Sequence, residues 1–136
     1  MTDLNQVVLE GRTTSGIGEG DFTYLSTGTA KLTIHIANNK SIKQGEQWVD
    51  DVSFFDVVFW GNLAENMKDK IYKGLAVVVS GRMKQDRWKD NNGNNRSKVY
   101  LNGEYIKTFP KEQNGQNNSQ GNNQDYDDGY ITGAKK

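Results

Sequence analysis

The chain has 136 residues, of which 34% are hydrophobic and 25% are charged, a composition that predicts one domain and a part that does not pack. It has no cysteine and one histidine, which excludes a disulfide framework, a thiolate nucleophile and metal sites built on sulfur or on clustered histidines. Seventeen basic residues balance seventeen acidic ones, so the net charge by itself does not point to nucleic acid.

Two features bear on membranes and targeting. The longest purely apolar run, Leu75–Val79, is far too short to span a bilayer. The segment Met1–Gln6 lacks the basic region and apolar core of a secretory signal. We therefore expect a cytoplasmic protein without a membrane partner.

The first third of the chain predicts two strands. Residues 4–10 are rich in Leu and Val, and the Gly/Ser/Thr-rich stretch 13–20 predicts a loop. Apolar and polar residues alternate over 30–37, which is typical of a half-buried strand. The alternation stops at Asn38, so residues 38–45 are predicted as a loop.

Residues 48–60 predict a third, longer strand because β-branched and aromatic residues dominate them. Period-two alternation gives this strand two apolar faces, and we expect one to meet the core and the other a partner or ligand. The first face holds Val52, Phe54, Val58 and Trp60, and the second holds Phe55, Val57 and Phe59.

Residues 62–73 switch to helical spacing. Asn62 is a candidate N-cap with Glu65 bonding back to it, and Gly74 stands where a C-cap belongs. The apolar stripe of this helix consists of Leu63, Met67 and Ile71.

Strand residues resume at Leu75 and continue to Lys89. A turn at 90–95 and a returning strand at 96–106 complete a hairpin. Three strands, one helix and two more strands predict a mainly β protein, an OB-fold five-stranded Greek-key barrel with its helix between the third and fourth strands.

The composition changes after Pro110. All residues from 113 to 124 are Gln, Asn, Gly or Ser, which bury too little apolar surface to offset the entropy of ordering. We expect an OB domain over 1–110 and a disordered tail over 111–136. The tail ends in an acidic-aromatic cluster, a weak candidate for binding replication or repair proteins, which includes Asp125, Asp127, Asp128, Tyr130 and Ile131. A tail that only solubilises is the alternative.

Catalysis has little support in the sequence. His35 has Lys31 and Thr33 beside it on its strand face, and these cannot complete a catalytic triad. Asp50 and Asp51 are neighbours in a strand and point to opposite faces. No phosphate-binding glycine motif is present. We therefore expect no enzymatic activity and no cofactor or metal.

Stacking has better support. Phe54 and Trp60 share one face of a strand, and Trp88 lies among charged residues of the hairpin, where Tyr100 could pair with it. Aromatic rings interleaved with cations suit single-stranded nucleic acid, because every base has a face that can stack. Residues 1–110 carry fourteen basic and thirteen acidic residues, but 82–98 has a local net charge of +4. The candidate phosphate contacts are Arg12, Lys31, Lys73, Arg82, Lys84, Arg87, Lys89 and Arg96.

Over residues 4–109 the chain resembles the bacterial and phage single-stranded DNA-binding proteins with one OB domain. Several segments in the right order carry the resemblance, and the fourth and last are the most specific. These segments are 9–12 (LEGR), 26–30 (STGTA), 36–39 (IANN), 54–65 (FFDVVFWGNLAE), 73–74 (KG), 77–82 (VVVSGR) and 87–90 (RWKD).

The resemblance implies that Phe54, Trp60 and Trp88 stack on DNA bases, and that the protein is a homo-oligomer, commonly a tetramer. Phe55 and Val57 are then candidates for core or subunit packing. Three departures accompany it. Ile42 stands near a position that often holds an aromatic residue, Asp56 stands where a basic or amide residue is frequent, and the tail lacks the acidic run with Ile-Pro-Phe.

These observations predict sequence-independent binding and protection of single-stranded DNA in replication, recombination and repair. The alternative is an OB-fold adaptor that binds proteins in a replication or primosome complex through the doubly apolar strand 52–60. Stacking and phosphate contacts serve RNA as well as DNA, so the residues alone do not separate the two.

Overall fold

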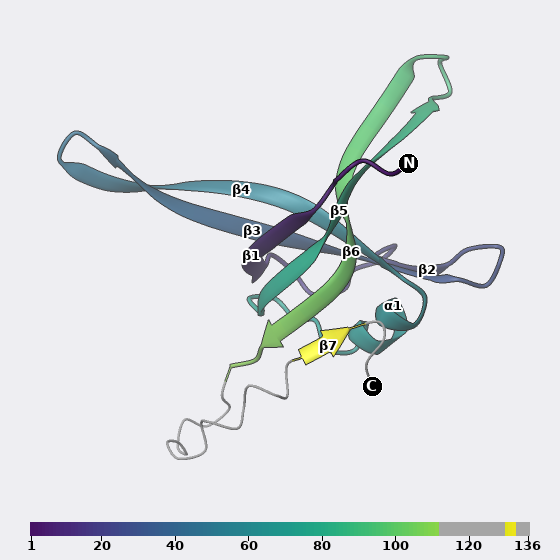
Figure 1. Cartoon of the computed structure of the whole chain (residues 1–136), viewed down its shortest axis with the longest axis horizontal. Coiled ribbons are helices and arrows are strands. Elements are labelled where there is room, and N and C mark those ends of the chain that lie inside the picture. The colour runs from purple at the N-terminus through teal and green to yellow at the C-terminus, as the bar shows by residue number, and fades with distance from the viewer. Residues whose placement is uncertain (112–129, 133–136) are drawn as a thin grey trace.

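The structure is a computed structural model that describes residues 1–111 and 130–132 (Figure 1). Seven strands and one helix make up these residues. In chain order they are β1 (Val7–Thr13), β2 (Phe22–Tyr24), β3 (Ala30–Gln44), β4 (Gln47–Trp60), α1 (Gly61–Met67), β5 (Ala76–Lys89), β6 (Asn95–Phe109) and β7 (Tyr130–Thr132). No helix in the described ranges has the length and apolar character needed to cross a membrane.

Five of the strands close into a barrel in the order β1-β5-β6-β4-β3, with β3 pairing back to β1. The closing contact is short and antiparallel and joins Arg12 to Ala37 and Thr13 to Ile36. Strands β4 and β6 pair in parallel over two residues, with Val57 opposite Leu101. The helix lies between the third and fourth barrel strands along the chain. The predicted OB-fold is therefore confirmed.

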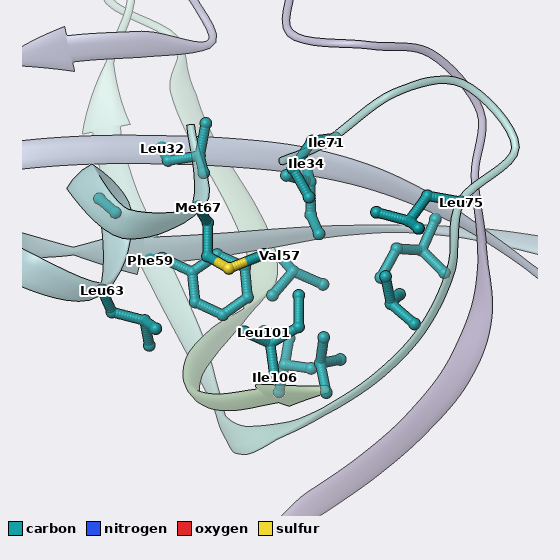
Figure 2. Close-up of a cluster of buried hydrophobic side chains, with 14 of the residues drawn as sticks. Leu32, Ile34, Val57, Phe59, Leu63, Met67, Ile71, Leu75, Leu101 and Ile106 are labelled. Carbon is teal, nitrogen blue, oxygen red and sulfur yellow. The ribbon is translucent and has the colours of Figure 1, made fainter. Parts of the chain in front are cut away.

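The barrel interior is filled by alternate residues of the strands, because successive strand side chains point to opposite faces. Figure 2 shows side chains of this core, with Phe59, Met67 and Leu101 pointing toward one another. A side chain at Gly103 would collide with the Phe59 ring, so the absence of a Cβ there lets β6 pass close to the core. The largest fully buried side chains are Phe59, Leu32, Ile34, Ile36, Met67, Leu75, Ile106, Val57, Val77 and Val79.

Two long hairpins extend beyond the barrel in different directions (Figure 1). One is β3–β4, paired continuously from Lys31 opposite Trp60 to Gln44 opposite Gln47. The prediction of a loop over 38–45 is therefore wrong. Strand pairing continues there because backbone hydrogen bonds, not a buried face, hold a ribbon that has solvent on both sides. Gly45, at a φ of 65°, supplies the turn.

The other hairpin is β5–β6, which matches the predicted pair 82–89 and 96–106. It closes through a turn in which the Asp90 carboxylate accepts hydrogen bonds from the backbone N–H groups of Asn92 and Asn94. A register shift between Ser80 and Gly81 marks the place where the hairpin leaves the barrel wall.

The helix is shorter than predicted and has no side-chain cap. It begins at Gly61, directly after β4, so that Trp60 occupies the N-cap position and Asn62 lies inside the first turn. Glu65 accepts a hydrogen bond from the Tyr24 hydroxyl at 2.9 Å instead of bonding back to Asn62. The helix ends at Met67, so Gly74 is not its C-cap. The predicted stripe of Leu63, Met67 and Ile71 is nevertheless buried.

Two short strands were not predicted. Strand β2 pairs with β3, and β7 pairs with β6 over Tyr105–Lys107. Because β7 falls within 111–136, that stretch is not a tail without structure throughout. Residues 112–129 and 133–136, and with them Asp125, Asp127 and Asp128 of the acidic cluster, lie outside the described residues.

Candidate nucleic-acid interface

The three aromatic residues predicted to stack on bases lie on the outside of the barrel. Phe54 is 70% exposed and Trp88 is 49% exposed, whereas Trp60 is half-buried. Phe54 and Trp60 occupy even positions of β4 and share its outer face, while Val57 and Phe59 on the other face fill the core. The predicted division of this strand into two faces is confirmed.

Trp60 connects the two hairpins. Its indole N–H donates a hydrogen bond of 2.8 Å to the side-chain oxygen of Asn102 in β6. The regular β5–β6 register between Gly81 and Lys89 puts Asn102 on the same ribbon face as Trp88. The outer face of β4 therefore continues onto the Trp88 face of β5–β6.

A second link joins the same two faces at Asp56. The Lys98 ammonium lies 2.6 Å from one carboxylate oxygen of Asp56, and His35 Nδ1 lies 2.7 Å from the other. His35 Nε2 lies 3.2 Å from Asp21. A lone carboxylate would repel phosphate, but Lys98 offsets the charge of Asp56. We call Asp21, His35, Asp56 and Lys98 the polar bridge.

The polar bridge shifts two pKa values. Partial burial disfavours the charged ring of His35, but hydrogen bonds to Asp56 and Asp21 and their negative charges outweigh it, so its pKa is raised above 6.5. Partial burial also opposes ionisation of Asp56. The hydrogen bonds and positive charges of Lys98 and His35 outweigh that effect and hold the Asp56 pKa below 3.8.

The raised pKa of His35 predicts a pH-dependent contribution to stability. Protonated His35 favours the folded state, so its contribution is complete below pH 6.5 and disappears as the pH rises through the raised folded-state pKa. We expect His35→Gln to lose more stability, relative to the original chain, at about pH 5.5 than at about pH 8.5. Urea unfolding of both proteins at the two pH values measures this difference. A difference that does not change with pH would contradict it.

The predicted phosphate contacts near Trp88 divide between two faces. Arg82, Lys84 and Arg96 share the Trp88 face of the hairpin, and Arg96 stands directly opposite Trp88. Arg87 and Lys89 flank Trp88 in β5 and therefore project from the reverse face. Sequence adjacency brought these two cations to attention, whereas the register favours the other three.

The pairing predicted between Trp88 and Tyr100 is wrong. Tyr100 lies opposite Lys84, is buried, and donates a long hydrogen bond of 3.4 Å to Asp86. Register across a hairpin is set by its turn and by any bulge, and neither could be placed from composition alone.

The remaining candidate cations stand in three settings. The Lys31 ammonium lies 5.5 Å from the centroid of the Trp60 ring, within cation–π range. Arg12 is opposite Ala37, which is in turn opposite Phe54, and its guanidinium donates to the Gly74 carbonyl at 3.1 Å. Lys73 is exposed in the turn before β5.

Sequence reasoning missed the residues that join the two faces. Asn102 and Asp21 were not singled out, and Lys98 was counted only as part of the basic stretch. Nothing in the pattern marks Asn102, because its role depends on the pairing of β4 with β6, two strands far apart in the chain.

Comparisons with known proteins agree on one family. The model of the single-strand binding protein family matches residues 4–109. The single-stranded DNA-binding protein of Borreliella burgdorferi is 37% identical to this chain. The match covers 100% of this chain and 87% of the Borreliella protein. The single-stranded DNA-binding protein of Treponema pallidum is 40% identical over 101 residues. The match covers 74% of this chain and 55% of the Treponema protein.

A solved structure gives the same result for the fold. A crystal structure of a deletion mutant of the single-stranded DNA binding protein from Thermus aquaticus superposes with a TM-score of 0.69 at 26% identity. The match covers 80% of this chain and 52% of the Thermus chain.

Proposed function

Since this chain belongs to the single-strand binding protein family, we propose that it binds and protects single-stranded DNA without regard to sequence. The observation that carries this proposal is the outer face shared by the two hairpins. Phe54, Trp60 and Trp88 lie on it, and the Trp60–Asn102 hydrogen bond joins its two halves.

The residues indicate how binding works. Exposed rings stack on successive bases, at about 1–3 kcal/mol per base, and tolerate any sequence. Arg82, Lys84 and Arg96 on the Trp88 face would hold phosphates, which makes affinity fall with salt. A duplex hides the faces of its bases, so the site favours single strands. No bond is made or broken, and the protein acts by binding alone.

Tryptophan fluorescence tests this function directly. Titration with an unstructured thymine oligonucleotide at low and high salt should give saturable quenching that salt weakens and that a duplex of equal length does not reproduce. A matched RNA oligonucleotide separates DNA from RNA preference. Absence of quenching and of binding would overturn the proposal and favour the protein adaptor.

Self-association is part of the proposal. A groove of about 250 Å³ lies between β1, β4, β5 and β6. It is lined mostly by apolar residues of the core-side faces, together with Phe54, Asp56 and Tyr100 of the outer faces. Strand β1 pairs with β5 over Val7–Arg12 and with β3 at Arg12 and Thr13, and the Asn38 side chain of β3 donates a hydrogen bond of 2.8 Å to the Glu10 carbonyl. The other edge of β1 is therefore open only from Val7 to Leu9. An apolar face beside an open strand edge fits a second copy of the chain. The apolar residues at the groove include Val7, Leu9, Phe55, Met83, Val99 and Leu101.

We expect a homo-oligomer, with a tetramer as the specific expectation, and Phe55→Lys should dissociate it. A lysine at this 40% exposed position costs little in a monomer but places an unpaired charge in an apolar interface. Sedimentation equilibrium of both proteins measures the change in mass. Monomeric behaviour of the unaltered chain at micromolar concentration would contradict the prediction.

Two further proposals concern the setting of the protein. Binding of single-stranded DNA would place it in the cytoplasm, in replication, recombination and repair. Recruitment of other proteins by Asp125, Asp127, Asp128, Tyr130 and Ile131 stays a prediction, because no side chain of that cluster is described.

A further inference from the structure

The β3–β4 hairpin carries a third aromatic residue on its outer face, in addition to Phe54 and Trp60. Trp48 lies near the hairpin tip and is 67% exposed. It precedes Phe54 by six residues in β4, as Phe54 precedes Trp60, and the pairing with β3 is unbroken between them. Since six is an even number of strand residues, the three rings belong to one face of one ribbon.

We propose that Trp48, with Lys43 directly across the ribbon, is an additional contact for single-stranded DNA that extends the path outward along β3–β4. This inference rests on the proposed function and adds a subsite to it. Trp48 would stack on a base and Lys43 would meet an adjacent phosphate. Because β3–β4 projects from the barrel, this contact lies well outside the core path (Figure 1).

Packing within the described chain does not account for Trp48. Its cross-strand partner Lys43 is exposed, and the next pair on the same face, Ser41 and Asp50, is exposed as well. The nearest fully buried residue of β4 is Val57, nine positions away on the opposite face. A large exposed indole without apolar neighbours is available to a ligand.

Charge and distance define what this subsite can do. Asp50 shares the face of Trp48 and offsets Lys43, so stacking supplies most of the attraction and salt should affect this subsite weakly. Six strand residues span about 20 Å, so Trp48 lies about that far from Phe54. Only an oligonucleotide that runs past the barrel can reach it.

The test uses a protein in which Trp48 is the only tryptophan, made by Trp60→Phe and Trp88→Phe. It is titrated with thymine oligonucleotides of about 8 and about 32 nucleotides, the first within and the second beyond the range for one OB fold. Binding is followed independently by the anisotropy of a label on the DNA. We expect the long DNA to quench Trp48 and the short DNA to bind without quenching it.

Substitutions give a second measurement in the otherwise unaltered chain. Trp48→Leu should weaken binding of the long oligonucleotide about 5- to 10-fold, near the lower limit for one stacked base, and leave the short one unchanged. Trp48→Phe should restore most of the affinity. Lys43→Gln should have a smaller effect of the same kind, and Lys40→Gln, on the opposite ribbon face, is its matched control.

The outcomes separate this inference from the proposed function. Binding of the long DNA without a change in Trp48 emission, or equal loss for both lengths in Trp48→Leu, would overturn the Trp48 subsite and leave the function intact. Absence of binding by the unaltered chain would remove both. A Trp48 emission that depends on protein concentration without DNA would assign the residue to subunit contacts and would also overturn the inference.

Discussion

Replacing Phe54 and Trp88 together by alanine is expected to weaken binding of a thymine oligonucleotide by about 2–6 kcal/mol, or roughly 30-fold to 10⁴-fold. Each ring contributes about 1–3 kcal/mol if it stacks on one base. The two lie on different hairpins, so their effects should be close to additive. Both side chains are largely exposed, so the folded state should tolerate their removal.

Fluorescence anisotropy of labelled DNA measures this loss, and Phe109→Ala is the matched control. Phe109 is also exposed, and the Lys107 ammonium lies 5.2 Å from its ring centroid, but it stands at the far end of β6 from the Trp88 tip. Binding should weaken by a similar factor for thymine, adenine and mixed oligonucleotides. A loss confined to one sequence, or an equal loss in Phe109→Ala, would argue against stacking on the shared outer face.

The aromatic and electrostatic contributions should separate by salt dependence. The double alanine variant keeps every cation, so the slope of affinity against salt should stay near that of the unaltered chain. Replacing Arg96 by Gln should reduce that slope by less than about one unit, because Asp90, 2.9 Å from the guanidinium, already offsets part of its charge. The register assigns a smaller reduction to Lys89→Gln, because Lys89 projects from the reverse face.

Local pattern predicted those parts of the fold in which one face is buried. Residues 30–37 alternate because Leu32, Ile34 and Ile36 fill the barrel, and the alternation is visible in the sequence. Beyond Asn38 both faces of the ribbon meet solvent, so no alternation marks the strand although its pairing continues to Gln44. The pattern reports burial, and backbone pairing without burial leaves little trace in the sequence.

The candidate site was predictable as a set of residue types and not as a geometry. Phe54 and Trp60 could be chosen because they share one face of a predicted strand, and Trp88 because its sequence neighbours are charged. The three side chains lie on one continuous face because β4 pairs in parallel with β6 and because β5 has a bulge at Ser80 and Gly81. Both are consequences of barrel closure, which a single sequence does not display.

The polar bridge illustrates the same limit at Asp56. In the sequence, Asp56 is a carboxylate where related proteins frequently have a basic or amide residue. In the folded chain Lys98, 42 positions away in sequence, reaches it at 2.6 Å and His35 at 2.7 Å. Charge compensation across a barrel depends on three-dimensional neighbours, so counting charges along the chain misjudges such a residue.

Phe59→Ala should destabilise the fold by about 3–5 kcal/mol, a large part of the roughly 5–15 kcal/mol that stabilises a typical domain. Phe59 is fully buried in the barrel, and it follows Val58 and precedes Trp60 of the outer face. Gly103 lies directly against the Phe59 ring, and as a glycine it has no side chain that could fill the space left by the ring. The cavity therefore cannot collapse easily, which favours the upper part of the range.

Urea unfolding measures this change, with Phe54→Ala as the control from the same strand. Phe54 is 70% exposed, so its loss should change stability by no more than about 0.5 kcal/mol. The two variants should then show opposite behaviour: Phe54→Ala lowers affinity for DNA in a stable fold, whereas Phe59→Ala lowers stability and keeps its affinity where it remains folded. If Phe59→Ala lost affinity while fully folded, the core and the outer face of β4 would be coupled, because a change at Phe59 would have displaced Trp60.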